Sequence, residues 1–258
     1  MRLPLTILAA AFGYFLVLYA ESTLDFVGQD PFVQVDLRIA NLLALLRNPT
    51  LVRVFTAITT LGHWRVVIIL SVAASALLAL RGRVHYLPGL WLAFFGNQVT
   101  VALLKLAFAR PRPDVAVYAE NSFSFPSGHA ASSAAFCGVM TYILVRERWG
   151  PGLLAAMIGV TLAALIGLSR LFLGEHFLSD VLNGYLVGGL WAMLGIIWAK
   201  WLSTKIPKHR RVPHPSWRRL AVLGVVGVAG LALWLVVRDH EQTLTIRVDA
   251  VDTIHGGQ

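Results

Sequence analysis

The stretch SFPSGHAASSAAFCGVMTYILV, residues 124–145, decides how the chain is organised. Proline, serine, glycine and histidine stand near its start, and an apolar run from Ser127 to Val145 follows. The length and apolarity of that run predict a helix that crosses a lipid bilayer. Ionisable groups at a membrane boundary are costly and usually functional, so His129 is a candidate site residue. A buried structural histidine explains His129 equally well when it is considered alone.

The composition of the whole chain is that of a membrane protein. Of its 258 residues, 57% are hydrophobic and only 14% are charged, and the mean hydropathy is +0.69. We therefore predict an all-α, polytopic transmembrane helix bundle, with a six-helix core and a seventh span. The expected spans are Leu3–Ala20, Val66–Leu80, Tyr86–Ala109, Ser127–Val145, Gly152–Leu168, Phe177–Ala199 and Leu220–Val237. The first run is interpreted as a retained helix, because residues 18–20 make a weak signal-peptide cleavage site.

The basic residues indicate how the chain crosses the membrane. With the N-terminus in the cytoplasm, the inside segments hold 12 Lys and Arg and one acid, while the outside segments hold 10 Lys and Arg and 12 acids. This agrees with the positive-inside rule, and KIPKHRRVPHPSWRR, residues 205–219, is the strongest anchor. We interpret the net charge of +9 as attraction to anionic lipids and not to nucleic acid.

The spans divide the chain into four parts. The expected parts are a membrane core of six spans at 1–202, a basic cytoplasmic loop at 203–219, an extra span at 220–237 and a polar tail at 238–258. Residues 21–36 are expected to form a loop. Residues 37–62 predict two short amphipathic helices on the membrane surface, separated at Arg47-Asn48-Pro49. These helices either cover the mouth of a site or simply pack on the bundle.

Two proline-containing stretches place cations and a helix start on the outside face. In KLAFARPRP, residues 105–113, Lys105 closes the third span, and the two prolines stop the helix and push Arg110 and Arg112 toward extended backbone. In PSGH, residues 126–129, Ser127 is a good N-cap, and Gly128 lets the backbone approach a ligand closely. A helix start with free N–H groups is an anion site.

The third stretch is SRLFLGEHFLSD, residues 169–180, which adds Arg170. His176 and Asp180 are four residues apart and are expected on one face of the sixth span. Such an aspartate can accept the Nδ1 proton of the histidine and leave Nε2 free as a nucleophile. A metal site is the alternative, but Cys137 is the only cysteine and the cations here outnumber the acids. We therefore expect neither a metal nor another cofactor.

Together these stretches resemble the three signature motifs of the type 2 phosphatidic acid phosphatase family. The match is ordered and complete across its specified positions, which are Lys105, Arg112, Pro113, Pro126, Ser127, Gly128, His129, Ser169, Arg170, His176 and Asp180. The resemblance implies a metal-independent phosphatase in which His176 becomes a phosphohistidine, Asp180 orients it and His129 protonates the leaving oxygen. The phosphate would be held by Lys105, Arg112, Arg170, Ser127 and Gly128. Glu175 lies within a stretch that the motif leaves free; it either points away or would repel phosphate.

The resemblance also limits the expected activity. The substrate is expected to be a lipid phosphate or pyrophosphate, such as undecaprenyl pyrophosphate, phosphatidylglycerol phosphate or phosphatidic acid. The expected location is the periplasmic or extracellular face of a bacterial plasma membrane. Transfer of the phosphate to a second lipid is the alternative within enzymes. A lipid or phosphate transporter is the alternative from another class, although no internal repeat of the kind common in transporters is present.

Overall fold

All regular structure that the computed structural model describes is helical. The described residues are 31–118, 120–205 and 221–238, together with Thr6, Ile7, Ala10, Gly13, Tyr14 and Val17. The helices are α2 (Pro31–Leu45), α3 (Pro49–Thr60), α4 (Trp64–Leu80), η1 (Val84–Tyr86), α5 (Leu87–Phe108), α6 (Gly128–Glu147), α7 (Gly152–Phe172) and α8 (Leu178–Lys205). One more helix comprises Ala221–Arg238.

The helix lengths confirm a multi-pass, all-α membrane fold. Five of the described helices are long and apolar enough to cross a bilayer, or six if α3 and α4 form one bent span. The predicted seventh span is the helix Ala221–Arg238, none of whose apolar window is buried in the structure. Most of the predicted first span at 3–20, of the basic loop and of the polar tail lies outside the described residues. The division of the chain into four parts stays a prediction.

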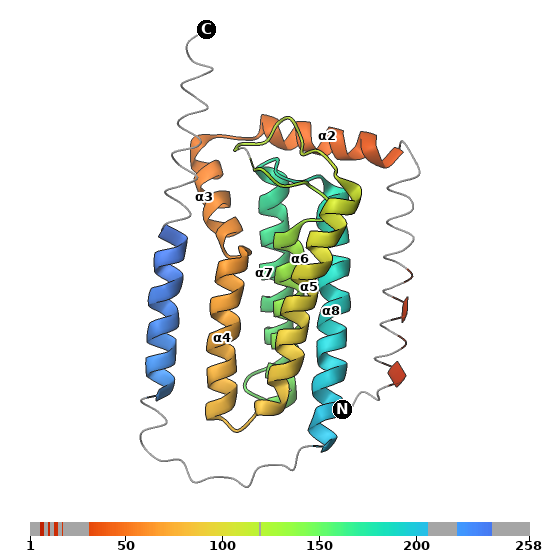
Figure 1. The fold of residues 1–258 in the computed structure, drawn as a ribbon. Coiled ribbons are helices and arrows are strands. Elements are labelled where there is room, and N and C mark those ends of the chain that lie inside the picture. Colours follow the sequence, from red (N-terminus) through yellow and green to blue (C-terminus); the bar gives the residue numbers. More distant parts are fainter. Residues whose placement is uncertain are drawn as a thin grey trace.

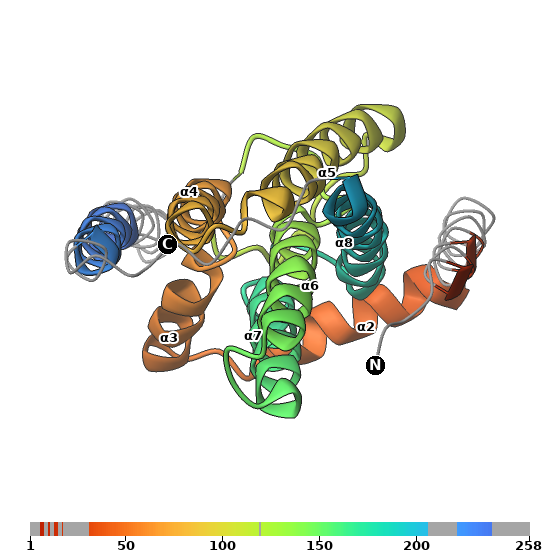
Figure 2. The same cartoon turned by 90° about the horizontal axis from the view of Figure 1, so that it is seen from below.

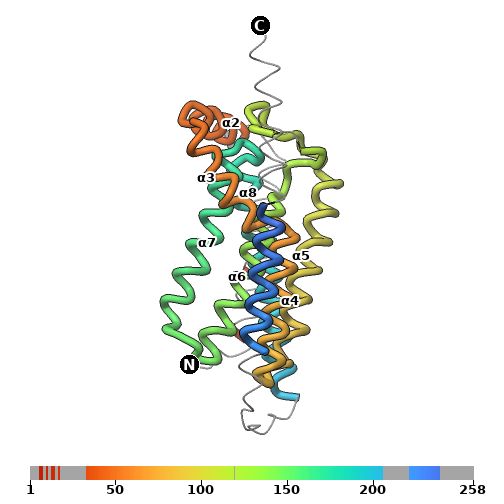
Figure 3. The backbone as a smooth tube through the Cα atoms, turned by 90° about the vertical axis from the view of Figure 1, so that its left-hand side faces the viewer, coloured from red at the N-terminus to blue at the C-terminus, as the bar shows by residue number. Residues whose placement is uncertain are grey.

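The long helices surround α6. Figure 2 shows α6 near the centre of the bundle, with α4, α5, α7 and α8 around it. The chain alternates in direction, so the end of α5, the start of α6, the end of α7 and the start of α8 lie at one end of the bundle, beneath α2 (Figure 1). Figure 3 shows α2 and the loop between α5 and α6 at that same end. This alternation places the three polar stretches together.

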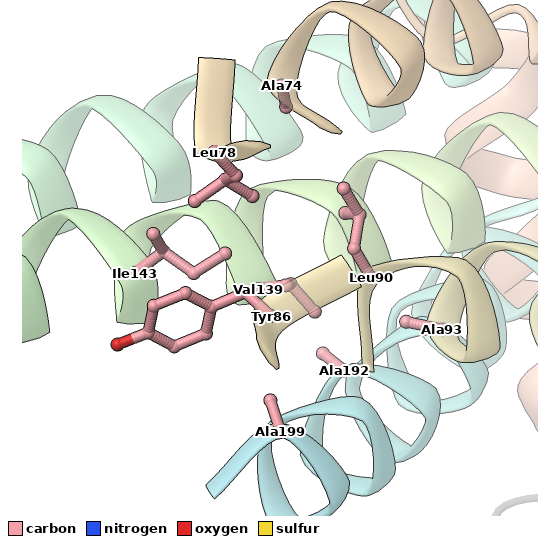
Figure 4. Packing of buried hydrophobic residues seen from close by; sticks show 9 residues of the cluster. All are labelled: Ala74, Leu78, Tyr86, Leu90, Ala93, Val139, Ile143, Ala192 and Ala199. Atoms are coloured by element: carbon pink, nitrogen blue, oxygen red, sulfur yellow. The ribbon is translucent and has the colours of Figure 1, made fainter. Parts of the chain in front are cut away.

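The largest apolar cluster lies at the opposite end of the bundle. Figure 4 shows side chains from α4, η1, α5, α6 and α8 meeting there. Leu78, Leu90 and Ile143 are completely or almost completely buried in it. In a membrane-spanning bundle such side chains stabilise the fold by van der Waals packing between helices, because the surrounding lipid is itself apolar. The apolar packing therefore holds one end of the bundle and leaves the other end for polar groups.

Small residues let α8 approach α6 closely. A Cβ atom at Gly188 would lie 2.1 Å from the carbonyl oxygen of Ala131, and one at Gly184 would lie 2.6 Å from that of Ser127. Glycine is therefore required at both positions. The pair Gly184 and Gly188 therefore packs inside the bundle.

The structure corrects one prediction about the outside segment and confirms another. Residues 31–36, predicted as loop, form the first part of α2, because proline is accommodated in the first turn of a helix. The break at Arg47-Asn48-Pro49 is confirmed, since α2 ends at Leu45 and α3 begins at Pro49. For α3 the structure favours the alternative of packing on the bundle, and its position relative to the membrane surface stays a prediction. This helix packs on α7, burying Thr56 and Thr59, and meets α4 at a bend of 44°.

Candidate active site

Backbone hydrogen bonds join the three polar stretches. The Ser124 N–H donates to the carbonyl oxygen of Arg110 at 2.9 Å, which ties the end of α5 to the segment before α6. The Ser127 N–H donates to the carbonyl oxygen of Asp180 at 2.9 Å, which ties the start of α6 to the first turn of α8. Segments 70 residues apart in sequence therefore meet at one end of the bundle.

His176 and Asp180 approach each other, but not as neighbours on one helix. His176 precedes α8, which begins at Leu178, so the predicted shared helix face is wrong. The Asp180 carboxylate instead folds back over the helix start, where its Oδ2 accepts the Phe177 N–H at 2.8 Å. The same Oδ2 lies 3.6 Å from Nδ1 of His176, and both side chains are buried. Catalytic hydrogen bonds are often this long without a ligand.

A tight turn returns the chain from α7 to His176. Gly174 has φ +70°, in the left-handed region that favours glycine. A Cβ atom there would lie 2.5 Å from Nη2 of Arg47 and 2.6 Å from the carbonyl oxygen of Val115. Arg47 also donates from Nε to the carbonyl oxygen of Phe172 at 2.8 Å. This arginine, which sequence reasoning did not place in the site, fixes the turn that carries His176.

One carboxylate bridges two of the predicted phosphate-binding cations. Glu120 accepts from Nη2 of Arg112 at 2.6 Å and from Nη2 of Arg170 at 2.8 Å. Arg170 is fully buried and also donates to the hydroxyl of Tyr118 at 2.7 Å. The third cation, Lys105, donates to the carbonyl oxygen of Phe123. Sequence reasoning did not identify Glu120, which lies in the loop between α5 and α6.

The electrostatics around His176 favour a neutral imidazole. Burial lowers the pKa of His176 well below its ordinary value, and the charges of Arg170, Arg112 and Lys105 lower it further, against an opposing effect of Glu120. All three predicted cations therefore act on the predicted nucleophile. An uncharged imidazole has the lone pair that a nucleophile needs.

Two glutamates in the site have opposite protonation behaviour. Burial would raise the pKa of Glu120, but Arg170 and Arg112 outweigh burial and lower that pKa to about 2. Burial raises the pKa of Glu175 to about 7, against the opposing effects of Arg170 and Arg112. Glu175 points toward the cations, because its Oε2 lies 3.2 Å from Nη1 of Arg112. Near neutral pH its carboxyl is partly protonated, so its repulsion of an anion is reduced.

The start of α6 has the predicted cap position but not the predicted cap bond. Ser127 is the N-cap of α6, yet its hydroxyl makes no capping hydrogen bond. The hydroxyl oxygen is buried and has no hydrogen-bond partner among the described residues. His129 lies in the first turn of α6, and its ring centroid is 5.9 Å from that of His63. Gly128 and His129 are partly exposed, whereas Ser127 is fully buried.

A protein from Bacillus subtilis (strain 168) named phosphatidylglycerophosphatase B is 32% identical to this chain over 206 residues, which cover 78% of this chain and 96% of that protein. Residues 86–204 match the model of the PAP2 superfamily. The chain belongs to the PAP2 superfamily. It is thereby a membrane enzyme of the phosphatase class, as the motifs predicted. The matched region extends from η1 to the end of α8 and contains all three polar stretches.

Two solved structures share the PAP2 fold of this chain. One is the crystal structure of a transmembrane PAP2-type phosphatidylglycerolphosphate phosphatase from Bacillus subtilis, with a TM-score of 0.65 and 30% identity. It covers 79% of this chain and 98% of its own. The other is that of Aquifex aeolicus LpxE, with a TM-score of 0.50, 30% identity, and coverage of 64% of this chain and 95% of its own.

In this PAP2 protein, ionisation of Glu175 should weaken phosphate binding at alkaline pH. Below pH 7 the carboxyl is mostly protonated, so wild type and Glu175→Gln should have similar KM values for a lipid phosphate. Above pH 7 only the wild type gains a negative charge beside Arg112. The wild-type KM should therefore exceed that of the variant by about 3- to 10-fold at pH 9.

The measurement is the ratio of the two KM values between pH 5.5 and 9, because the ratio cancels the ionisation of the substrate. Asp114→Asn is the matched control, since Asp114 is an exposed acid at the same end of the bundle, in the loop between α5 and α6. This control should keep the wild-type pH dependence. A ratio that stays constant with pH would mean that Glu175 does not face the bound phosphate.

Proposed function

We propose that the protein hydrolyses the phosphate ester of a membrane lipid through a phosphohistidine formed at His176. The observation that carries this proposal is a buried His176 with Nδ1 3.6 Å from Oδ2 of Asp180, and burial and three cations from different segments lower its pKa. With its Nδ1 proton directed at Asp180, the imidazole has its Nε2 lone pair available for attack.

Two displacements at phosphorus complete the reaction. In the first, Nε2 of His176 forms the P–N bond, the P–O bond to the lipid breaks, and His129 gives its proton to the departing oxygen. In the second, water attacks phosphorus, the P–N bond breaks, and inorganic phosphate leaves while His129 takes up a proton from the water. Asp180 orients His176 in both steps. No step needs a metal or a cofactor.

The phosphate oxygens are held by the cations that act on His176 and by polar groups at the start of α6. Lys105, Arg112 and Arg170 supply positive charge, and the buried hydroxyl of Ser127 and the N–H of Gly128 supply hydrogen bonds. Glu120 accepts one hydrogen bond from each arginine, so a phosphate that binds the same N–H groups displaces this carboxylate. A phosphate monoester with a charge of about −1.5 to −2 is a stronger partner for the arginines than one carboxylate.

The distribution of basic residues supports a site on the outer face. With Lys105, Arg112 and Arg170 assigned to the site, 7 basic residues remain in the outside segments against 12 inside, with the N-terminus in the cytoplasm. A site at this end of the bundle can take its substrate from the outer leaflet of a bacterial plasma membrane.

Phosphatidylglycerol phosphate is the first substrate to test, because the relative with 96% coverage carries the name phosphatidylglycerophosphatase B. The purified protein in detergent should release inorganic phosphate from this lipid, and the test panel adds phosphatidic acid and undecaprenyl pyrophosphate. Activity should persist in EDTA and with no second lipid as acceptor. Loss of activity in EDTA would contradict the metal-free mechanism, and phosphate release only with an acceptor lipid would favour phosphotransfer.

A further inference from the structure

We propose that Asp36 of α2 and Arg110 after α5 are positioning residues that hold Asp180 in the orientation needed by His176. Neither belongs to the signature motifs, and Asp36 lies outside the region matched by the family model. The inference rests on the proposed function, because it assumes that Asp180 orients a nucleophilic His176. It extends the site from the three polar stretches to the helix that lies across the end of the bundle.

The Asp180 carboxylate has different partners on its two oxygens. Oδ2 accepts the Phe177 N–H at 2.8 Å and faces His176, whereas Oδ1 accepts from Nη1 of Arg110 at 2.5 Å. Asp180 is fully buried, so water does not compete for either oxygen. Rotation of the carboxylate would break the bond to Arg110, and this bond therefore fixes the direction in which Oδ2 points.

Arg110 is itself fixed by a second carboxylate. Its Nη2 donates a hydrogen bond to Oδ2 of Asp36 at 2.9 Å. Its Nη1 donates both to Asp180 and to the Ser179 hydroxyl, the latter at 2.8 Å. The guanidinium carbon also lies 4.1 Å from the centre of the Phe177 ring. Two carboxylates and an adjacent ring restrict the orientation of this planar guanidinium.

Asp36 connects this arrangement to α2. Its Oδ1 accepts the N–H of Ser179 at 3.0 Å, and its Oδ2 accepts the Ser179 hydroxyl. Asp36 is buried on the same side of α2 as Ala40, one helical turn later, while Leu37 and Leu42 are exposed. An acid on the buried side of an apolar helix is unfavourable unless it is paired. Here it is paired with Arg110 and with the first turn of α8, which carries Asp180.

The two residues should shift the pH dependence of catalysis in opposite directions. Removing the negative charge of Asp36 leaves the positive charge of Arg110 less balanced, and this disfavours protonation of His176. The acidic limb of the kcat profile, where kcat falls as His176 becomes protonated, therefore moves to lower pH. Removing the positive charge of Arg110 favours protonation of His176 and moves that limb to higher pH. The other charged groups that act on His176 stay unchanged: Lys105, Arg112, Glu120, Arg170 and Asp180.

The experiment measures kcat and KM against pH for full-length Asp36→Asn and Arg110→Gln with phosphatidylglycerol phosphate in mixed micelles. We expect kcat to fall about 10- to 100-fold in each variant with KM within about threefold of wild type, because a misdirected nucleophile slows the chemical step. The acidic limbs should move in opposite directions. Arg38→Gln, a charge change on the exposed side of α2, is the matched control and should behave as wild type.

Unchanged kcat in both variants, or limbs that move in the same direction, would overturn the inference. If a single variant fails to fold, the charge-balanced double variant D36N/R110Q decides the question. A folded double variant with kcat reduced at least tenfold supports a positioning role, and wild-type kcat overturns it. His176→Ala measured in parallel separates the two proposals. An inactive His176→Ala beside a fully active Asp36→Asn refutes only the positioning role, whereas a wild type that releases no phosphate from any lipid phosphate refutes the function itself.

Discussion

Replacing His176 with alanine should abolish phosphate release, with a loss in kcat of roughly 10⁴-fold or more. Alanine has no lone pair to attack phosphorus, so the P–N bond cannot form. The fold should persist, because the loss is confined to one side chain in the turn before α8. The measurement is release of inorganic phosphate from the best lipid of the panel, together with the thermal stability of the purified variant.

The intermediate can be trapped in the same experiment. Wild-type protein quenched during turnover of a phosphorus-labelled lipid should carry label that is lost in acid and retained in alkali, as for a phosphoramidate, and His176→Ala should carry none. His85→Ala is the control, because His85 lies in η1 at the opposite end of the bundle. Turnover by His176→Ala within tenfold of wild type would remove His176 as the nucleophile.

Replacing His129 with alanine should produce the second large loss, about 10²- to 10⁴-fold in kcat on a lipid phosphate. The departing alkoxide of a lipid is strongly basic and needs a proton in the transition state. An aryl phosphate such as p-nitrophenyl phosphate leaves without that proton. The loss in His129→Ala should therefore be at least tenfold smaller on the aryl ester than on the lipid.

The comparison of the two leaving groups is its own control, because misfolding or lost binding lowers both rates alike. Equal losses on both esters would show that His129 is not the general acid. It would then act in binding, as its place at the start of α6 also permits.

The sequence was most informative where general physical constraints operate. Bilayer thickness sets the length of a span, so the helices containing Val66–Leu80 and Ser127–Val145 could be predicted within a few residues. The alternating direction of the spans then placed Lys105, His129 and His176 at one end without knowledge of any contact. Pro49 likewise marked the start of α3, because proline is accommodated at the beginning of a helix.

The sequence was least informative where a residue depends on partners far along the chain. Asp36 lies in α2, but its partner Arg110 is 74 residues away, and no local pattern joins them. Glu120 is an ordinary loop acid until the fold places it between Arg112 and Arg170. The position of His176 before α8 was missed because the mainly apolar run at 177–199 gives no sign of the exact helix start.

The carboxylate of Glu120 between the two arginines has a consequence for selectivity among membrane lipids. The bilayer around the protein is crowded with phosphodiester head groups, each carrying a single negative charge on its phosphorus. Such a diester carries no more negative charge than the Glu120 carboxylate. Exchanging Glu120 for a diester therefore gains little binding free energy. A terminal monoester carries roughly twice that charge and can displace the Glu120 carboxylate from the arginines. With the phosphate-binding roles proposed for Arg112 and Arg170, Glu120 would therefore favour monoester lipids over the more abundant diester lipids by their charge.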